Sequence, residues 1–155
     1  MARAKEFVRI LNNRKKNFQK NSVEVANQYA LAIQKELLQN TPVDTAKAIS
    51  NWTVTLDRPH DAEEPTYFVG MKGSSREASI RSAYDQAKTA LSDRRYGQRI
   101  FITNTAPYIL RLNDGYSMQA PAGFIEDSVY AAIYKVHYKH MTFFEKFVRR
   151  SLYGF

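Results

Sequence analysis

The sequence predicts an α+β fold: a small antiparallel sheet packed with a long N-terminal helix, a middle helix and a C-terminal helix. Apolar residues recur at helical spacing over residues 23–37, through residues 76–91 and again from residue 125. Residues 52–56 alternate apolar and polar side chains, as a strand with one buried face does. Helices and strands do not alternate regularly, which argues against a doubly wound parallel sheet.

Length and composition predict one domain over residues 1–155. A chain of 155 residues with 44% hydrophobic content can bury a substantial core. It has no cysteine, which excludes disulfides and thiolate metal sites and favours an intracellular product. No apolar leader follows the first residues and no window approaches the roughly 18 apolar residues of a membrane span. We therefore expect neither secretion nor a membrane partner.

The N-terminal helix is predicted from one apolar stripe. Its members step by three, four, three and four residues: Val23, Ala26, Ala30, Ile33 and Leu37. The seven-residue spacing of Leu11, Phe18 and Val25 extends the pattern back toward Phe7, although the residues between them are polar. Two alternatives follow for the start of the chain: a long, partly exposed helix, or an arm that becomes ordered only on a partner.

The net charge of +8 is concentrated at the two ends of the chain. Residues 1–20 carry seven Lys or Arg against one Glu, a net of +6, and residues 135–155 carry five against one, a net of +4. We assign a basic helical arm to residues 1–20, with Arg9, Arg14, Lys15 and Lys16 as candidate contact residues, and an interacting tail to residues 145–155. Such charges attract nucleic acid or an acidic protein, or simply form the solvated face of two helices.

The segment after the first helix predicts a short helix and two strands. Pro42 ends the first helix, because proline lacks the backbone donor that continuation needs. Asp44 or Thr45 is then positioned to cap a short helix that runs to about Ser50. Residues 52–56 form the first strand, residues 58–66 a proline-rich acidic loop and residues 67–71 a second strand.

The second half predicts a middle helix, a buried strand and a final helix. Ser74 or Ser75 caps a helix over residues 76–91, residues 93–98 turn, and residues 100–102 form the buried strand. The final helix starts at residue 125 and restarts at the capping box of residues 142–145. The middle helix has a thin apolar stripe, so it either lies on the surface or is completed by a neighbouring subunit. That stripe comprises Ile80, Ala83, Tyr84, Ala87 and Leu91.

No motif in the sequence predicts catalysis or a cofactor. His137 and His140 share a helical face, but nothing nearby supplies the further ligands a metal would need. The sequence contains no nucleophile elbow, phosphate loop or dinucleotide fingerprint. The acidic cluster at residues 57–64 lies in a proline-bounded loop, where solvated carboxylates are the ordinary outcome. We therefore expect a non-enzymatic protein with no catalytic, cofactor-binding or metal-binding residues.

Binding to nucleic acid is the alternative function. The basic ends of the chain and its ten tyrosines support it, but no recognisable RNA- or DNA-binding module is present. Tyr130, Tyr134 and Tyr138 form an aromatic stripe at helical spacing. Such a stripe favours packing in the core or against another subunit over stacking on bases.

Two segments carry a family resemblance: "TPVDTAKAISNW" at residues 41–52 and "TNTAPYILRLNDGYSMQAPAGF" at residues 103–124. They resemble the neck and tail-completion proteins of long-tailed bacteriophages, a family that includes minor tail proteins near the head-tail joint. There, Thr-Pro-Val-Asp-Thr-Gly follows a long first helix, and Pro-Tyr-Ala and Glu-aromatic-Gly precede a Gln-Ala-Pro-like stretch and a final helix. The two segments cover about a fifth of the chain. The matching residues are Thr41, Pro42, Val43, Asp44, Thr45, Ser50, Trp52, Asn104, Pro107, Tyr108, Gly115, Ser117, Gln119, Ala120, Pro121 and Gly123.

The chain departs from the family pattern at a few positions. Ala46 stands where the family usually has Gly, Ile109 where Ala is common, and Asn113-Asp114 where Glu-aromatic is common. The resemblance implies a structural virion protein, made in the host cytoplasm, that joins tail to head in a neck, tail-completion or tail-terminator ring. It implies a homo-oligomer, six-fold as tails commonly are, that contacts a connector or stopper ring and the tail tube and lies near DNA.

Unburied apolar area marks the candidate assembly contacts. A lone subunit would expose the thin middle helix, the segment around Pro121 and the aromatic C-terminus, whereas a ring would cover them. The alternative for the segment around Pro121 is a plain turn packed on its own subunit. The candidate contacts are Tyr84, Tyr108, Leu112, Met118, Pro121, Phe147 and Phe155.

Overall fold

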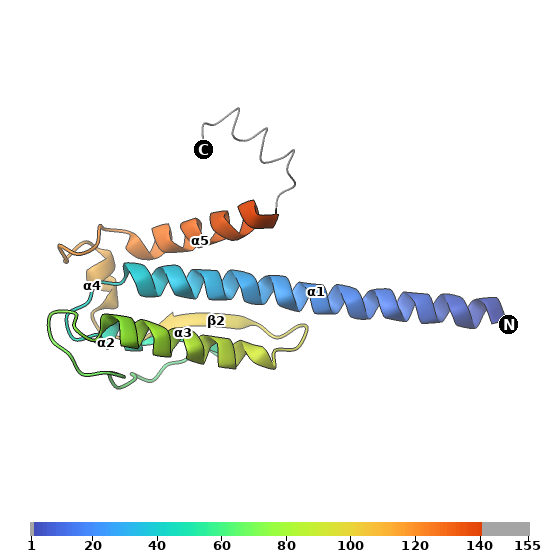
Figure 1. Ribbon diagram of the computed structural model, residues 1–155, viewed down its shortest axis with the longest axis horizontal. Coiled ribbons are helices and arrows are strands. Elements are labelled where there is room, and N and C mark those ends of the chain that lie inside the picture. Colours follow the sequence, from blue (N-terminus) through green and yellow to red (C-terminus); the bar gives the residue numbers. More distant parts are fainter. Residues whose placement is uncertain (1, 141–155) are drawn as a thin grey trace, which may run out of the picture.

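The computed structural model describes residues 2–140 of the chain and has the predicted α+β fold (Figure 1). The predicted helix restart at residues 142–145, the candidate contacts Phe147 and Phe155, and the tail of residues 145–155 lie outside the described residues. In chain order the elements are α1 (Ala2–Asn40), α2 (Lys47–Ser50), β1 (Trp52–Leu56), α3 (Arg76–Ser92), β2 (Ile100–Asn104), α4 (Ile109–Asn113) and α5 (Phe124–His140).

The first helix, α1, is continuous for 39 residues and combines two different halves. Its C-terminal half is buried at Ala30, Leu37 and Leu38, and it lies between α5 on one side and the sheet with α3 on the other (Figure 1). Every side chain of residues 3–18 is exposed, and this part extends beyond the other elements. We call residues 3–18 the arm; of the two sequence-based alternatives, the structure has the long helix.

The sheet has two antiparallel strands, with Trp52 opposite Asn104 and Leu56 opposite Ile100. Trp52 and Val54 are buried, as the alternation in β1 predicts. A strand is present at residues 100–102, as predicted, but the prediction that it is buried is wrong, because all five residues of β2 are only half-buried. No described strand pairs with the outer edge of β2, so that edge has no strand to cover it.

The predicted second strand over residues 67–71 is wrong: these residues form bends and irregular structure, and a turn follows at residues 72–75. Side chains, rather than another strand, bond the backbone of this segment. The Tyr67 backbone N–H donates to Ser50 Oγ over 3.0 Å, and the Met71 N–H donates to Ser74 Oγ over 3.2 Å. The apolar run that suggested a strand therefore points largely outward, and Val69 is 95% exposed.

The predicted side-chain capping bonds are absent, although Ser75 does occupy the predicted cap position of α3. Ala46 occupies the cap position of α2, with φ 62°, and no side chain caps that helix. Asp44 instead accepts the Lys72 N–H at Oδ1 over 3.0 Å. Ser75 occupies the cap position of α3 without a capping bond, while Ser74 bonds to the preceding loop. These residues anchor the segment between β1 and α3.

Helices α3 and α5 bury small side chains. Ala83, Ala87 and Leu91 of α3 are buried within the same chain. These three residues of the thin stripe therefore need no neighbouring subunit to cover them. On α5, Ser128 and Ala132 are fully buried, and Ser128 Oγ accepts a 2.9 Å bond from Asn40 Nδ2 of α1. Because side chains this small sit at the contacts, the helices can approach closely.

The tyrosine stripe does not form part of the core. Tyr130 is 71% exposed and Tyr134 is 43% exposed, and the Tyr134 and Tyr138 rings stack with their centroids 6.0 Å apart. The prediction that the stripe packs in the core of its own subunit is therefore wrong for Tyr130 and Tyr134, while Tyr138 is half-buried. Packing against another subunit remains a prediction.

Candidate assembly surface

The two segments that carry the family resemblance pack against each other, although fifty residues separate them. Gln119 Oε1 accepts the Val43 N–H over 2.8 Å, and Asn104 Nδ2 donates to the Ala48 carbonyl over 2.8 Å. Buried residues from both segments share one core cluster: Val43, Ala46, Ala48, Ile49, Trp52, Ala106, Ile109, Ala120 and Phe124. The sequence does not show that these segments meet; the fold brings them together.

Buried hydrogen bonds hold the first segment onto the end of α1. Trp52 Nε1 donates to Thr41 Oγ1 over 2.8 Å, and that hydroxyl donates to the Leu37 carbonyl over 2.6 Å. Gln34 of α1 donates to the Trp52 carbonyl over 3.0 Å. Because these groups are buried, their bonds avoid the cost of unsatisfied polar atoms. The turn from α1 into β1 is thus fixed by its own side chains.

A half-open cavity of about 370 Å³ lies between the two segments. Residues 42–48 line it from the first segment, and Tyr108, Leu112, Ser117 and Gln119 line it from the second. Tyr108 is half-buried here, and this burial raises the pKa of its phenol, while the nearby Lys47 charge acts in the opposite direction. The candidate contacts Tyr108 and Leu112 therefore face a shared hollow rather than open solvent.

The other candidate contacts lie on two different parts of the surface. Met118 is fully exposed, and Pro121 is exposed beside a second cavity of about 260 Å³. Tyr84 lies on α3, half-buried against the core, with Lys88 Nζ 4.7 Å from its ring centroid. Four candidates thus belong to the segment around α4, and Tyr84 belongs to α3.

Sequence reasoning missed two exposed side chains in the same segment, Leu110 and Tyr116, each 72% exposed. Leu110 lies next to the buried Ile109 on a helix only five residues long, too short for apolar spacing to assign a face. Tyr116 lies with its ring centroid 5.4 Å from the Arg111 guanidinium carbon. With Met118, they are the large exposed apolar side chains of the segment around α4.

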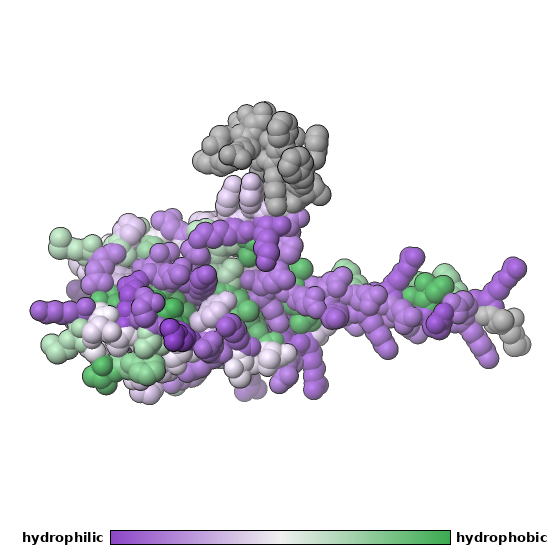
Figure 2. Space-filling model, viewed as in Figure 1, coloured by the Kyte–Doolittle hydropathy of each residue, from purple (hydrophilic) through white to green (hydrophobic). Residues whose placement is uncertain are grey.

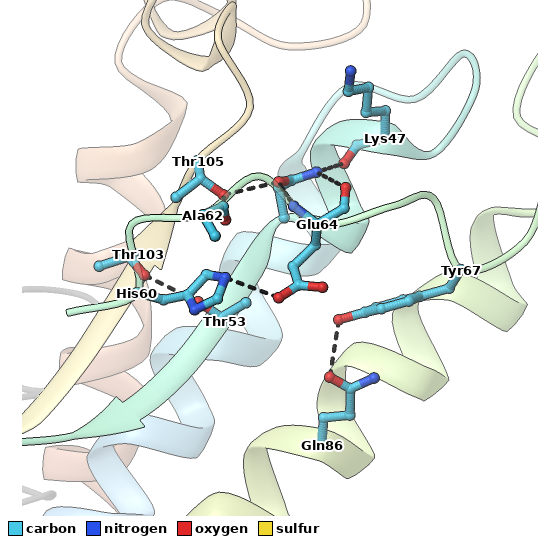
Figure 3. A network of polar contacts seen from close by, with 10 residues as sticks. Lys47, Thr53, His60, Ala62, Glu64, Tyr67, Gln86, Thr103 and Thr105 are labelled. Atoms are coloured by element: carbon cyan, nitrogen blue, oxygen red, sulfur yellow. Dashed lines mark hydrogen bonds and ion pairs between the residues drawn. The ribbon is translucent and has the colours of Figure 1, made fainter. Parts of the chain in front are cut away.

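A polar network anchors the acidic loop that follows β1 (Figure 3). The fully buried Asn51 donates to the Lys47 and Glu64 carbonyls over 2.9 and 3.1 Å and accepts the Glu64 N–H over 2.8 Å. Glu64 Oε1 lies 2.8 Å from His60 Nε2, and Glu63 pairs with Lys47. Asp57, Asp61 and Glu63 are exposed, as sequence reasoning predicted for this loop, while Glu63 and Glu64 also have partners.

Asp57 has a structural role at the start of the same loop. Its carboxylate accepts Gln98 Nε2 over 2.8 Å and the Arg99 N–H over 3.1 Å, so it joins the ends of the two strands. The Gln98 bond, and then the Arg99 bond, lower the pKa of Asp57. Both bonds favour the ionised carboxylate over a proton-donating acid.

The basic arm presents apolar as well as charged side chains to solvent. Arg9, Arg14, Lys15 and Lys16 are all exposed, and Arg9 forms a 2.7 Å ion pair with Glu6. Figure 2 shows a hydrophobic patch among the hydrophilic side chains near the free end of the arm. The exposed apolar residues of the arm are Phe7, Val8, Ile10, Leu11 and Phe18.

Comparisons with protein-family models, with curated proteins and with solved structures gave no match to this chain. Within residues 2–140, no three acidic or histidine side chains gather closely enough to hold a metal ion. In the same part of the chain, no helix is both long and apolar enough to cross a membrane. The candidate surface must therefore be interpreted from its own residues.

Proposed function

We propose that this protein is a structural virion component of a phage neck, which joins tail to head by protein-protein contacts in a ring. One observation carries the proposal: the two segments that resemble the family fold into a single unit at one end of the molecule. That unit exposes Leu110, Tyr116 and Met118 to solvent. Several large apolar side chains exposed within one segment are typical of a protein contact site.

The backbone at the glycine positions of the pattern gives independent support. Gly115 and Gly123, both part of the resemblance, adopt φ 89° and 79°, a region that glycine occupies readily. Ala46, which stands where the family usually has Gly, adopts φ 62°. Three positions of the pattern thus have the left-handed geometry that explains a preference for glycine, including the one where this chain departs from it.

Electron microscopy of virus particles from the genome that encodes this chain tests the proposal. Density for the chain, or a label attached to it, is expected as a closed ring between portal and tail tube, with six copies. Particles from a genome that lacks the gene are expected to contain separate heads and tails. Complete particles without the chain, or a label located elsewhere, would refute the proposal.

Nucleic-acid binding is the second candidate, favoured by the exposed basic side chains of the arm. A salt titration of DNA affinity distinguishes the two. A steep fall of log affinity with log salt, equivalent to several phosphate contacts, would support this candidate. A shallow fall would indicate that the arm serves protein contacts.

A further inference from the structure

The arm has an apolar stripe with a basic rim. Phe7, Leu11 and Phe18 step by four and seven residues, which places them on one face of the helix, and all three are exposed. At 100° per residue, Arg14 and Lys15 flank that stripe, whereas Lys5 and Lys16 lie on the opposite face. An apolar centre with a charged rim is the usual anatomy of a protein interface.

A surface with the complementary charge lies at the other end of α1. It comprises the exposed apolar residues Leu110, Tyr116 and Met118 and the exposed carboxylates of Asp114, Glu126 and Asp127, and we call it the α4–α5 surface. Residues 112–134 contain these three acids and no Lys or Arg, although Arg111 lies over the Tyr116 ring and Arg76 borders the cavity beside Asp127. No ion pair within the described residues involves any of the three.

Side-chain bonds hold this surface together. Asn113 Nδ2 donates to Glu126 Oε2 over 2.9 Å, and Asn113 Oδ1 accepts the Ile125 N–H over 2.9 Å, so the end of α4 is tied to the start of α5. The Asn113 bond lowers the pKa of Glu126, which favours its charged form. Carboxylates in the first turn of a helix also interact favourably with its dipole. That role accounts for Glu126 and Asp127 but not for Asp114 or the apolar side chains beside it.

The arm cannot reach the α4–α5 surface of its own chain. Asn40, at the end of α1, bonds to Ser128 of α5, so the surface lies beside that end of the helix. At about 1.5 Å per residue, Leu11 lies roughly 40 Å away along the same continuous helix. Figure 1 shows the free end of α1 at one extreme of the molecule and the α4–α5 connection at the other.

We propose that the apolar stripe of the arm binds the α4–α5 surface of a second copy of this chain. Arg14 and Lys15 then lie beside Asp114 and Asp127 of the neighbour, and Leu11 lies beside its Met118. The contact is heterologous, since two different patches meet, and such contacts close into rings or continue as filaments. This inference rests on the proposed function and deepens it by naming the surfaces that join neighbouring subunits.

Cysteine cross-linking tests the contact directly, because the natural chain contains no cysteine. Full-length Leu11→Cys and Met118→Cys proteins are purified separately, mixed and oxidised mildly. A disulfide-linked dimer containing one chain of each kind is expected, with a yield that falls several-fold between about 0.05 and 0.5 M salt. Thr89→Cys, exposed on α3, replaces Met118→Cys as the control and is expected to give little product.

Charge reversal provides the matched control on the arm. Arg14→Glu with Lys15→Glu is expected to reduce the mixed dimer at least ten-fold, and Asp114→Lys with Asp127→Lys on the partner is expected to restore it. Lys5→Glu with Lys16→Glu makes the same change in net charge on the opposite face and is expected to have a much smaller effect. Circular dichroism establishes that each variant is folded.

Several results would overturn the inference. A dimer formed mainly between two Leu11→Cys chains would mean that arms pair with arms. An equal effect of both charge reversals would mean that only overall charge matters, as for DNA or an anionic membrane. If no mixed dimer forms, the proposed contact between the arm and the α4–α5 surface is wrong. If the chain nevertheless occupies the neck ring of particles, only this inference fails; if it is missing there, the proposed function fails.

Discussion

Ala46 shows how one residue carries both strain and packing. Its φ of 62° costs an L-residue about 1–2 kcal/mol, yet its methyl group is buried in the main core cluster. Ala48 is equally buried but lies inside α2, where glycine is unfavourable. The two alanines therefore form a matched pair in which only the backbone geometry differs.

We predict that Ala46→Gly is nearly neutral and that Ala48→Gly destabilises the protein. Each substitution loses the burial of one methyl group, about 0.8 kcal/mol. Ala46→Gly regains a similar amount by relieving the left-handed strain, whereas Ala48→Gly loses about 1 kcal/mol more in helix propensity. Urea unfolding measures the difference, expected at about 1–2 kcal/mol. Equal effects of the two substitutions would contradict the backbone argument.

Tyr108 makes stability sensitive to high pH. Burial raises its pKa, so the folded protein holds the phenolic proton more tightly than the unfolded chain. The resulting stability is fully present below the unfolded pKa of about 10 and is lost as pH rises through the folded pKa. We predict that the urea midpoint of the natural protein falls between about pH 8 and pH 11.

The Tyr108→Phe variant is expected to show a smaller fall over the same pH range. Part of the fall remains, because burial also raises the pKa of Tyr67. Absorbance of tyrosinate, followed during the same titration, reports the ionisation independently. An identical pH dependence in the natural protein and the variant would show that Tyr108 does not contribute.

The sequence predicted the residues of the site better than their contacts. Spacing placed Trp52 and Val54 on the buried face of β1, because a strand in a half-buried sheet has a period of two residues. Spacing could not indicate that Asp44 bonds Lys72 rather than capping α2, because a short polar side chain serves either purpose locally. The choice depends on a loop twenty-eight residues away.

At the scale of elements, the least regular segment depends on one buried side chain. Residues 57–75 connect β1 to α3 without regular structure, and Asn51 fixes their course through its bonds to Glu64. The apolar run at residues 67–71 suggested a strand because alternation alone does not show whether a partner strand exists. Long helices were predicted well, since their spacing repeats over several turns.

We predict that Asn51→Ala destabilises the protein by about 2–3 kcal/mol, because it removes the buried amide that bonds the half-buried Glu64 N–H and Glu64 carbonyl. The Lys47 carbonyl keeps its bond from the Asn51 backbone N–H. Hydrogen exchange is expected to accelerate most over residues 57–75. Asn12→Ala, on the exposed arm, is the control and is expected to change stability by less than about 0.5 kcal/mol. Uniform acceleration over the whole chain would contradict a local anchoring role.

For the whole molecule, the arm is the part that the fold does not explain. Its side chains contribute nothing to the core, and its nearest aromatic contact is an edge-to-face arrangement of Phe18 with Tyr96, with the ring centroids 6.4 Å apart. The sequence predicted its charge, its heptad spacing and, as one of two alternatives, a long, partly exposed helix. A helix that gains little from its own chain requires another source of stability.

Removal of residues 1–18 separates folding from assembly. The deletion removes six basic residues and one acid, a net charge of +5, and every side chain of residues 3–18 is exposed. We predict that the unfolding free energy of the remaining chain changes by less than about 1 kcal/mol, the value of a single aromatic pair. Self-association, measured by sedimentation at low salt, is expected to disappear. A large loss of stability would show that the arm belongs to the folded core, and unchanged self-association would show that subunits join through other surfaces.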